Sequence, residues 1–436
     1  MRNLGRLISV FVLCVVAALL AVAPASAAPR PPDAAVRYVR AEASGNGSGR
    51  SWKHAASWRD LDLMIEAVGP GGEVLVAADD PLPGTPEVVL RHGGAPGAPV
   101  TIRGVSRSTG APAVASVHGD RAQPVPGLAV MAGRPYAVVD PGQSGSVALS
   151  LGAGADHLRI AHLGAVDVGV AIEVAEPVTD LEIVDLAARN VGRVLNVLDS
   201  GRVTGLTVSR WTVNGFSQGV VRLRGGSSAV RIVDVVADSE GQQAEPGSST
   251  IGIAMHGDPN TPPNHDITVV NVQVRNLFDR SDGYLQGDGF TTEELDYDVT
   301  FVDCLVDGAT DAGFDLKSAS TTVERPVVLS AKRSFRVQPN QTGVVEAFPI
   351  VINAPRSHDL WAPLGRGLPS HVQGRGVALL TDIDFSQWTT SPIFDADGLA
   401  RFTVQGGTVM APQATVMASE EPGAVVTIAD VTRLDR

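Results

Sequence analysis

The middle of the chain is built from short β-branched segments that recur at a nearly regular spacing. Seven of them begin at Leu158, Leu181, Leu206, Val230, Ile267, Val299 and Val323. Their separations are 23, 25, 24, 37, 32 and 24 residues, and each segment alternates apolar with polar positions. Repeats of this length without helical periodicity are typical of a solenoid whose coils consist of strands. The sequence therefore predicts an all-β fold, a right-handed parallel β-helix.

A second anchor, a glycine in most coils, follows each of these segments. The anchors are Gly169, Gly192, Gly219, Gly252, Gly289, Gly313 and Ser334. Residues one and three positions after an anchor are mostly apolar, and residues two apart in a strand share one face. We therefore expect them to point into the coil, with Phe290, Phe314 and Phe335 forming an aromatic ladder. Arg193 and Arg222 stand in the same positions and do not fit an apolar interior.

The two ends of the repeat region are expected to differ from its middle. An amphipathic capping helix is predicted from Ser57 onward, because an open solenoid end exposes apolar side chains and an unpaired strand edge. The β-helix is assigned to residues 28–345. Residues 346–436 lose the clear period and contain several prolines, so they are predicted to form either irregular final coils or a small C-terminal β cap.

The N-terminus has the features of an export signal. Two arginines precede an apolar run from Leu7 to Ala23, and the small residues Ala25–Ala27 provide a cleavage site. We expect residues 1–27 to be removed as a signal peptide, leaving a secreted or periplasmic protein with no stable membrane insertion. The mature chain then keeps one cysteine, Cys304, and is predicted to be a monomer.

The composition narrows the class of partner. With 34 basic and 47 acidic residues the formal net charge is −13. This charge excludes nucleic-acid binding that depends on a positive charge of the whole chain. Only three of the basic residues are lysines, and two of these, Lys317 and Lys332, lie in one short stretch of the repeat region. A local positive site is therefore expected there.

Three consecutive coils carry charged residues on columns expected to face solvent. They are Asp288 and Glu293 in the first coil, Asp311, Asp315 and Lys317 in the second, and Lys332, Arg333 and Arg336 in the third. His256 takes the corresponding place one coil earlier. Adjacent coils lie ~4.8 Å apart, so these side chains are within reach of one another. The two longest repeats add insertions beside this cluster, as is common for the walls of a binding groove.

The cluster holds the residue types that chemistry on a uronate requires. Carboxylates of Asp288, Asp311 and Asp315 suit Ca²⁺, which prefers several oxygen ligands and can neutralise a substrate carboxylate. A lysine or arginine near other cations has its neutral form favoured and can then abstract the proton α to that carboxylate. The candidate catalytic residues are Lys317, Lys332, Arg333 and Arg336. The candidate substrate-binding residues are His256, Glu293 and Tyr284.

Two segments of this cluster resemble a known motif. The run Gly287-Asp288-Gly289-Phe290-Thr291, followed by Asp311-Ala312-Gly313-Phe314-Asp315-Leu316, is similar to the DGFA…DDGWDL pattern of calcium-dependent pectate lyases. Those enzymes belong to the secreted β-helix proteins of the pectate-lyase-like superfamily. The resemblance implies that Asp288, Asp311 and Asp315 are calcium ligands. Ala312 replaces the second aspartate of the pair, and the lysine base of the family has no counterpart at a matching spacing.

These features predict a secreted polysaccharide lyase that cleaves an acidic, uronate-containing polysaccharide by β-elimination. A β-helix glycoside hydrolase that uses two of the aspartates as a carboxylate pair is the alternative enzyme, and an epimerase is a further possibility. A non-catalytic carbohydrate-binding protein of the cell surface is the alternative from another class. Cross-strand charge ladders that keep a solenoid soluble would produce the same pattern without any site.

Overall fold

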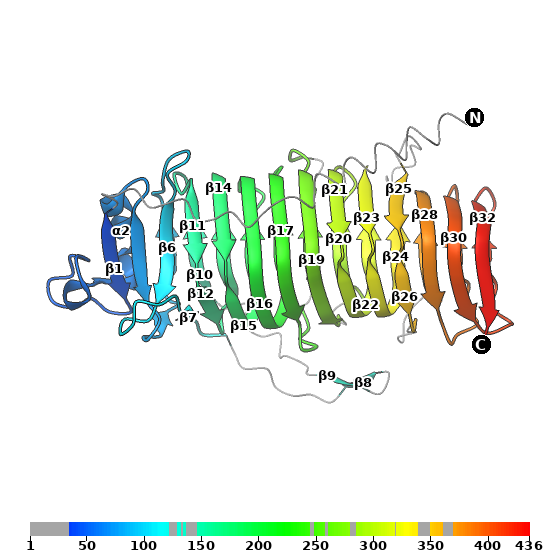
Figure 1. The fold of residues 1–436 in the computed structure, drawn as a ribbon, viewed down its shortest axis with the longest axis horizontal. Coiled ribbons are helices and arrows are strands. Elements are labelled where there is room, and N and C mark those ends of the chain that lie inside the picture. Colours follow the sequence, from blue (N-terminus) through cyan, green and yellow to red (C-terminus); the bar gives the residue numbers. More distant parts are fainter. Residues whose placement is uncertain are drawn as a thin grey trace. The chain divides into compact units, whose positions relative to one another are not determined.

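The described residues between 35 and 436 form a parallel β-helix in which successive coils follow one another along a single axis (Figure 1). The computed structural model describes residues 35–121, 146–244, 248–257, 260–279, 285–318, 320–338, 349–360 and 369–436, and the backbone of the hairpin β8 (Ala129–Met131) and β9 (Arg134–Tyr136). One sheet of 30 strands contains every described strand except that hairpin. This confirms the predicted fold class. The predicted signal peptide lies outside the described residues.

The first coils pack against one short helix. They comprise β1 (Val36–Arg40), β2 (Ala56–Ser57), β3 (Glu73–Ala77), β4 (Leu82–Pro83), β5 (Val88–Leu90), β6 (Val100–Val105) and β7 (Ala115–His118), with two 3-10 turns at Trp52–His54 and Trp58–Asp60. The helix α2 (Leu61–Val68) buries Leu61, Ile65 and Val68, which share one face at helical spacing. It covers the N-terminal end of the apolar interior, as predicted. No helix in the described part of the chain is long and apolar enough to span a membrane.

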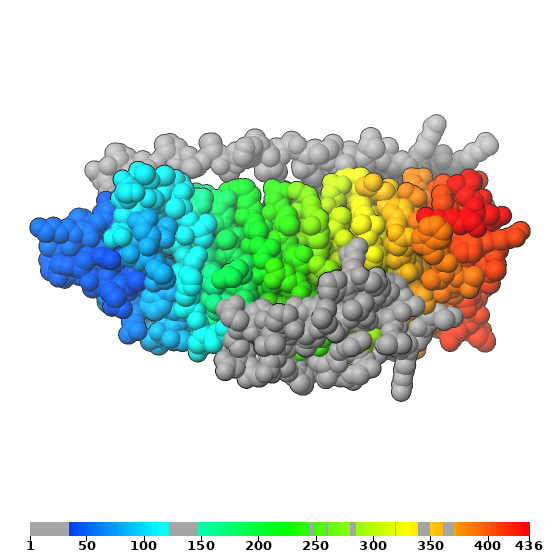
Figure 2. All heavy atoms as spheres, turned by 90° about the horizontal axis from the view of Figure 1, so that it is seen from below, coloured from blue at the N-terminus to red at the C-terminus, as the bar shows by residue number. Residues whose placement is uncertain are grey.

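Each later coil contributes strands to three faces. The face that carries the charged columns consists of β10 (Val147–Leu151), β13 (Val170–Val174), the ends of β15 (Ala187–Val197) and β16 (Arg202–Leu223), β18 (Ile251–Met255), β20 (Asp288–Thr292), the ends of β22 (Leu305–Leu316) and β24 (Val327–Val337), β27 (Ser370–Gly374), β29 (Phe394–Ala396) and β31 (Ala418–Glu420). Successive members pair in parallel. The coils therefore appear as consecutive bands of colour along the axis in Figure 2.

The other two faces are built from the remaining strands. These are β11 (Leu158–Ala161), β12 (Leu163–Val166), β14 (Pro177–Val184), β17 (Ser228–Asp238), β19 (His265–Leu277), β21 (Tyr297–Val302), β23 (Thr321–Glu324), β25 (Ile350–Asn353), β26 (Arg356–His358), β28 (Val377–Ser386), β30 (Arg401–Ala411) and β32 (Val425–Asp435). Long strands such as β16 turn a corner, since β16 pairs with β14, β15, β17 and β18. In its described part, the region from residue 350 onward continues the same stack of coils through β28, β30 and β32.

The structure contains the aromatic ladder that the sequence predicts. Phe290 pairs in register with Phe314, and Phe314 with Phe335. The rings stack with centroid separations of 4.8 Å and 5.4 Å, and all three side chains are fully buried. Such stacked contacts add to the gain from burying each ring. The ladder prediction is confirmed.

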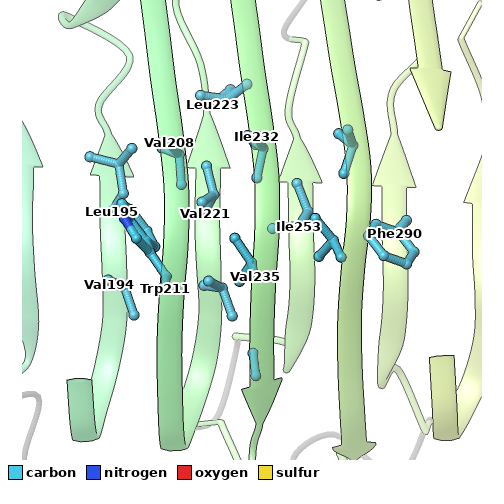
Figure 3. Packing of buried hydrophobic residues seen from close by; sticks show 14 of the residues in the cluster. Val194, Leu195, Val208, Trp211, Val221, Leu223, Ile232, Val235, Ile253 and Phe290 are labelled. Atoms are coloured by element: carbon cyan, nitrogen blue, oxygen red, sulfur yellow. The ribbon is translucent and has the colours of Figure 1, made fainter. Parts of the chain in front are cut away.

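The register is different at Arg193 and Arg222. Strand β15 pairs with β16 so that Leu195 lies opposite Val221, and a bulge falls between Val191 and Arg193. Leu195, Val221, Ile253 and Phe290 therefore form the inward column, which Figure 3 shows on successive strands. This register accounts for Arg193 and Arg222, the two exceptions among the apolar positions that the sequence predicts, because the inward column falls on Leu195 and Val221 in their coils. Both guanidinium groups belong to the charged face.

We expect Phe314→Ala to lower the free energy of unfolding by about 3–5 kcal/mol, because it removes a buried ring and leaves a cavity in the middle of the ladder. Denaturant unfolding followed by circular dichroism measures the change. Val236→Ala is the matched control, since Val236 is 44% exposed on the same solenoid. Its effect should stay within about 0.5 kcal/mol. Equal effects of the two substitutions would contradict the role of the ladder.

Candidate active site

Three columns of side chains run across the strands of the charged face. The first column consists of Arg193, Gly219, Ile251, Asp288, Ala312 and Arg333. The middle column consists of Asn196, Arg222, Ala254, Thr291, Asp315 and Arg336. The third column, two residues further along each strand, consists of Arg224, His256, Glu293 and Lys317. These columns contain seven of the ten predicted site residues. Asp311 pairs with Arg333, and Lys332 precedes Arg333 in the chain. The tenth, Tyr284, lies outside the described residues.

The predicted aspartates are engaged by cations of neighbouring coils. Arg333 donates a hydrogen bond from its guanidinium to the Asp311 carboxylate, and both side chains are buried. A guanidinium nitrogen of Arg336 lies 3.5 Å from Asp311 Oδ2 and 3.6 Å from Asp315 Oδ2. Lys317 Nζ lies 3.0 Å from Asp315 Oδ2. Arginine and lysine therefore supply the positive charge among these carboxylates.

This pairing bears on the predicted calcium site. Among the residues that the structure describes, no group of three or more His, Cys, Asp or Glu side chains is arranged to hold a metal ion. Asp311 and Asp315 each have two cationic contacts. These positive charges would repel a divalent cation at the same carboxylate oxygens. The described carboxylates, paired as they are with cations, therefore do not fit a Ca²⁺ site in this arrangement.

Asp288 differs from its two neighbours because no cation among the described residues contacts it. The described contacts include one hydrogen bond to its Oδ1, donated by the backbone N–H of Ala312 at 2.8 Å. Burial raises the pKa of Asp288 well above its ordinary value, and the charges of Asp311 and Asp315 raise it further. Both effects favour the protonated form of Asp288, which can donate a proton.

The two lysines have opposite protonation tendencies. Burial lowers the pKa of Lys317, but the charges of Asp315 and Glu293 outweigh it and raise the pKa above its ordinary value. The Lys317 ammonium also donates a hydrogen bond to Glu293 Oε1 at 2.9 Å. The expectation that nearby cations favour a neutral Lys317 is therefore wrong, because carboxylates surround it. Burial and the charge of Arg333 do lower the pKa of Lys332, which is 2% exposed.

His256 is a half-buried residue whose ring lies among cations. Its backbone N–H donates to the Leu223 carbonyl at 2.9 Å, which places it beside Arg224 in the third column. Burial lowers the pKa of His256 to about 3, and the charges of Arg224, Arg222, Arg193 and Lys317 contribute. The imidazole is therefore neutral at physiological pH and has a nitrogen able to accept a proton.

Two polar atoms at the centre of the face have no hydrogen-bond partner within the described structure. They are Thr291 Oγ1 and Asp315 Oδ1, both buried. Thr291 and Asp315 lie opposite one another on adjacent coils. Buried polar atoms are normally satisfied, so an exception of this kind in an outward column is consistent with a ligand contact.

The sequence did not identify Arg193 and Arg222 as site residues. Both face the same side as His256, and each adds positive charge to it. The sequence does contain an indication of their role, because two arginines at positions assigned to an apolar interior indicate a displaced strand register. A bulge of one residue in a strand cannot be located from period alone.

The chain has few detectable relatives. No family model matches it, that of calcium-dependent pectate lyases included, and no curated protein sequence matches it. The solved structure of the catalytic unit of a thermostable GH87 alpha-1,3-glucanase from Streptomyces thermodiastaticus is similar over 94% of this chain and 70% of that chain, with 12% identity and a TM-score of 0.49.

Two other solved structures are similar at lower scores. An alginate lyase from Paenibacillus sp. matches 85% of this chain and 96% of its own, with 13% identity and a TM-score of 0.41. The pectate lyase Pel9A matches 88% and 78%, with 13% identity and a TM-score of 0.32. Similarity at this level does not indicate which reaction, if any, this chain catalyses.

We expect the ring resonances of His256 to stay unchanged between about pH 5 and 8 in the free protein, because its imidazole remains neutral there. His371, buried in the interior, has its pKa lowered to about 3 as well and serves as the matched control. The unfolded chain binds protons on these histidines below pH 6.5 while the folded chain does not, so both disfavour folding as the pH falls from 6.5 toward 3. NMR titration of labelled histidines tests this, and a midpoint near 6.5 for His256 would contradict it.

Proposed function

We propose that the protein binds an acidic polysaccharide on the charged face and cleaves it by β-elimination at a uronate residue. The third column carries this proposal. Neutral His256 lies between Arg224 on one coil and Glu293 on the next, and Glu293 in turn pairs with Lys317. A proton acceptor, a carboxyl group and cations thus stand on consecutive coils ~4.8 Å apart.

The reaction assigns one role to each of these groups. His256 accepts the proton from C5, the carbon α to the uronate carboxylate, and the electron pair of that C–H bond moves into the carboxylate as an enolate. The pair then forms the C4–C5 double bond as the C4–O bond breaks, and the leaving oxygen takes a proton from Glu293. Burial raises the pKa of Glu293, which favours its acid form, although Lys317 opposes this.

Two cations stabilise the charge that develops in this step. The Lys317 side chain is 11% exposed and the Arg336 side chain 23% exposed, so both reach the surface. Their positive charge favours the enolate-like form of the uronate carboxylate over its ground state. Arg333 is buried against Asp311, and we assign it to positioning rather than to contact with substrate.

Glycoside hydrolysis is the second candidate, and Asp288 is the observation that favours it. A carboxyl group with a raised pKa beside two further carboxyl groups is the arrangement that a hydrolase uses. Asp288 would protonate the glycosidic oxygen, while Asp311 or Asp315 would activate water or attack the sugar. This reaction needs no proton α to a carboxylate, so it has no requirement for a uronate or for His256.

The export signal that the sequence predicts supports a place of action outside the cytoplasm, where polysaccharides of a cell envelope or its surroundings are found.

Incubation with a panel of polyuronates distinguishes the candidates. We expect an ultraviolet absorbance from unsaturated product ends, formed together with new reducing ends. The assay should be run with and without added Ca²⁺, because the sequence predicts calcium ligands among the aspartates. Reducing ends without the absorbance would support the hydrolase. Binding of the polysaccharide without either product would support the non-catalytic carbohydrate-binding alternative.

We expect His256→Gln to lower kcat by at least about 10²-fold, because it removes the proton acceptor. His265→Gln is the control, since His265 stacks on Tyr297 at 4.9 Å in another strand and has no contact with the charged columns. Asp288→Asn separates the mechanisms: it should abolish hydrolysis but leave elimination measurable. Full activity of the His256 variant would refute the elimination mechanism drawn above.

A further inference from the structure

We propose that Arg193 and Arg222 form a subsite for a second carboxylate of the same polysaccharide, toward the N-terminal side of the reactive residues. The nature of the ligand rests on the proposed function, whereas the site itself rests on the arrangement of charge in the β15 and β16 coils. The substrate would therefore be a polymer or oligomer with at least two acidic residues.

Arg193 is a buried cation without a described carboxylate partner. The residue is 5% exposed, and its guanidinium has one described acceptor, Gln218 Oε1 at 3.4 Å. Burial lowers the pKa of Arg193 well below its ordinary value, and the charges of Arg222 and Arg224 lower it further. A guanidinium nevertheless stays charged in proteins, so it cannot escape this environment by losing its proton. A buried charge without a counter-ion is strongly unfavourable, and an anionic ligand would compensate it.

Arg222 reaches a carboxylate only through an intervening amide. Its Nε donates to Asn196 Oδ1 at 2.8 Å, and Asn196 Nδ2 donates to Glu173 Oε2 at 3.0 Å. Arg224, by contrast, pairs directly with Asp199 Oδ2 at 2.7 Å. The uncompensated positive charge of this region therefore lies at Arg193 and Arg222 rather than at Arg224.

A further guanidinium lies next to Arg193. A β-carbon at Gly192 would stand 3.0 Å from a terminal nitrogen of Arg121 and 2.4 Å from the Gly169 carbonyl oxygen. The absence of a side chain at Gly192 thus lets Arg121 pass over the backbone beside Arg193. Arg121 is anchored by a hydrogen bond to Ser217 Oγ at 2.8 Å. Three arginines consequently converge on one turn of the solenoid.

The chemistry of these groups identifies the ligand as an oxyanion. Guanidinium donors form paired hydrogen bonds with carboxylates and phosphates. Arg222 stands in the same column as Thr291, with the small residue Ala254 between them, so the two side chains lie two coils or ~10 Å apart. A polysaccharide that runs along the solenoid axis can therefore present one acidic residue to the arginines and another to the reactive residues.

Binding measured by calorimetry tests the subsite without requiring turnover. The wild-type protein and two variants, Arg193→Met and Arg222→Gln, are titrated with a polyuronate oligosaccharide and with its carboxyl-reduced counterpart. We expect each variant to weaken polyuronate binding by at least about tenfold, toward the level of the reduced chain. Arg210→Gln is the control, because Arg210 lies on the same strand β16 but pairs with Asp185 on another face.

Thermal unfolding supplies a second measurement. Arg193→Met should raise Tm while it weakens binding, because it removes a buried charge that the free protein leaves uncompensated. Bound polyuronate should also raise the pKa of His256 but not that of His371, since only His256 lies beside the arginines. Unchanged binding in both variants, or equal binding of the carboxyl-reduced chain, would overturn the subsite. Charge-dependent binding without any product would retain the subsite and refute the proposed reaction.

Discussion

The structure depends on the in-register parallel stacking of its coils. Because each strand repeats the position of the strand before it, one register fixes both the interior stacks and the columns on the surface. The ladder of Phe290, Phe314 and Phe335 holds that register through three coils. A displacement of one residue in a strand moves a side chain to the opposite face, so the same constraint that builds the core decides which charges reach the site.

The charged face contains several buried ionisable groups, which the stability of a solenoid does not require. Buried ion pairs such as Arg333 with Asp311 add little to stability compared with apolar replacements, whereas strongly perturbed groups concentrate at functional sites. The pKa of Asp288 is raised and that of His256 is lowered, so both shifts favour the neutral form. The overall charge of −13 repels a polyanion, so the arginines of the β15 and β16 coils are what makes local attraction possible.

The spacing of the repeats predicts where the candidate site residues lie, but it does not predict the protonation and partners of their side chains. The period places Asp288, Asp315 and Lys317 on adjacent coils, and their side chains do lie together. The protonation of Lys317 depends on Glu293 one coil away and on burial, which no pattern along a single strand reveals. The neutral state of His256 likewise results from burial and, to a lesser extent, from arginines that lie 32 or more residues earlier in the chain.

The sequence by itself determined the class of fold, the aromatic ladder and the stretch of chain in which charge accumulates. These features follow from a local period, because residues at one position of successive repeats stack when the coils stack. The tertiary structure alone decided the register at Arg193 and Arg222, the pairing of the aspartates with cations, and the protonation of the lysines and of His256. These depend on a bulge and on the burial of charges from different coils, and both arise from contacts between residues distant in the chain.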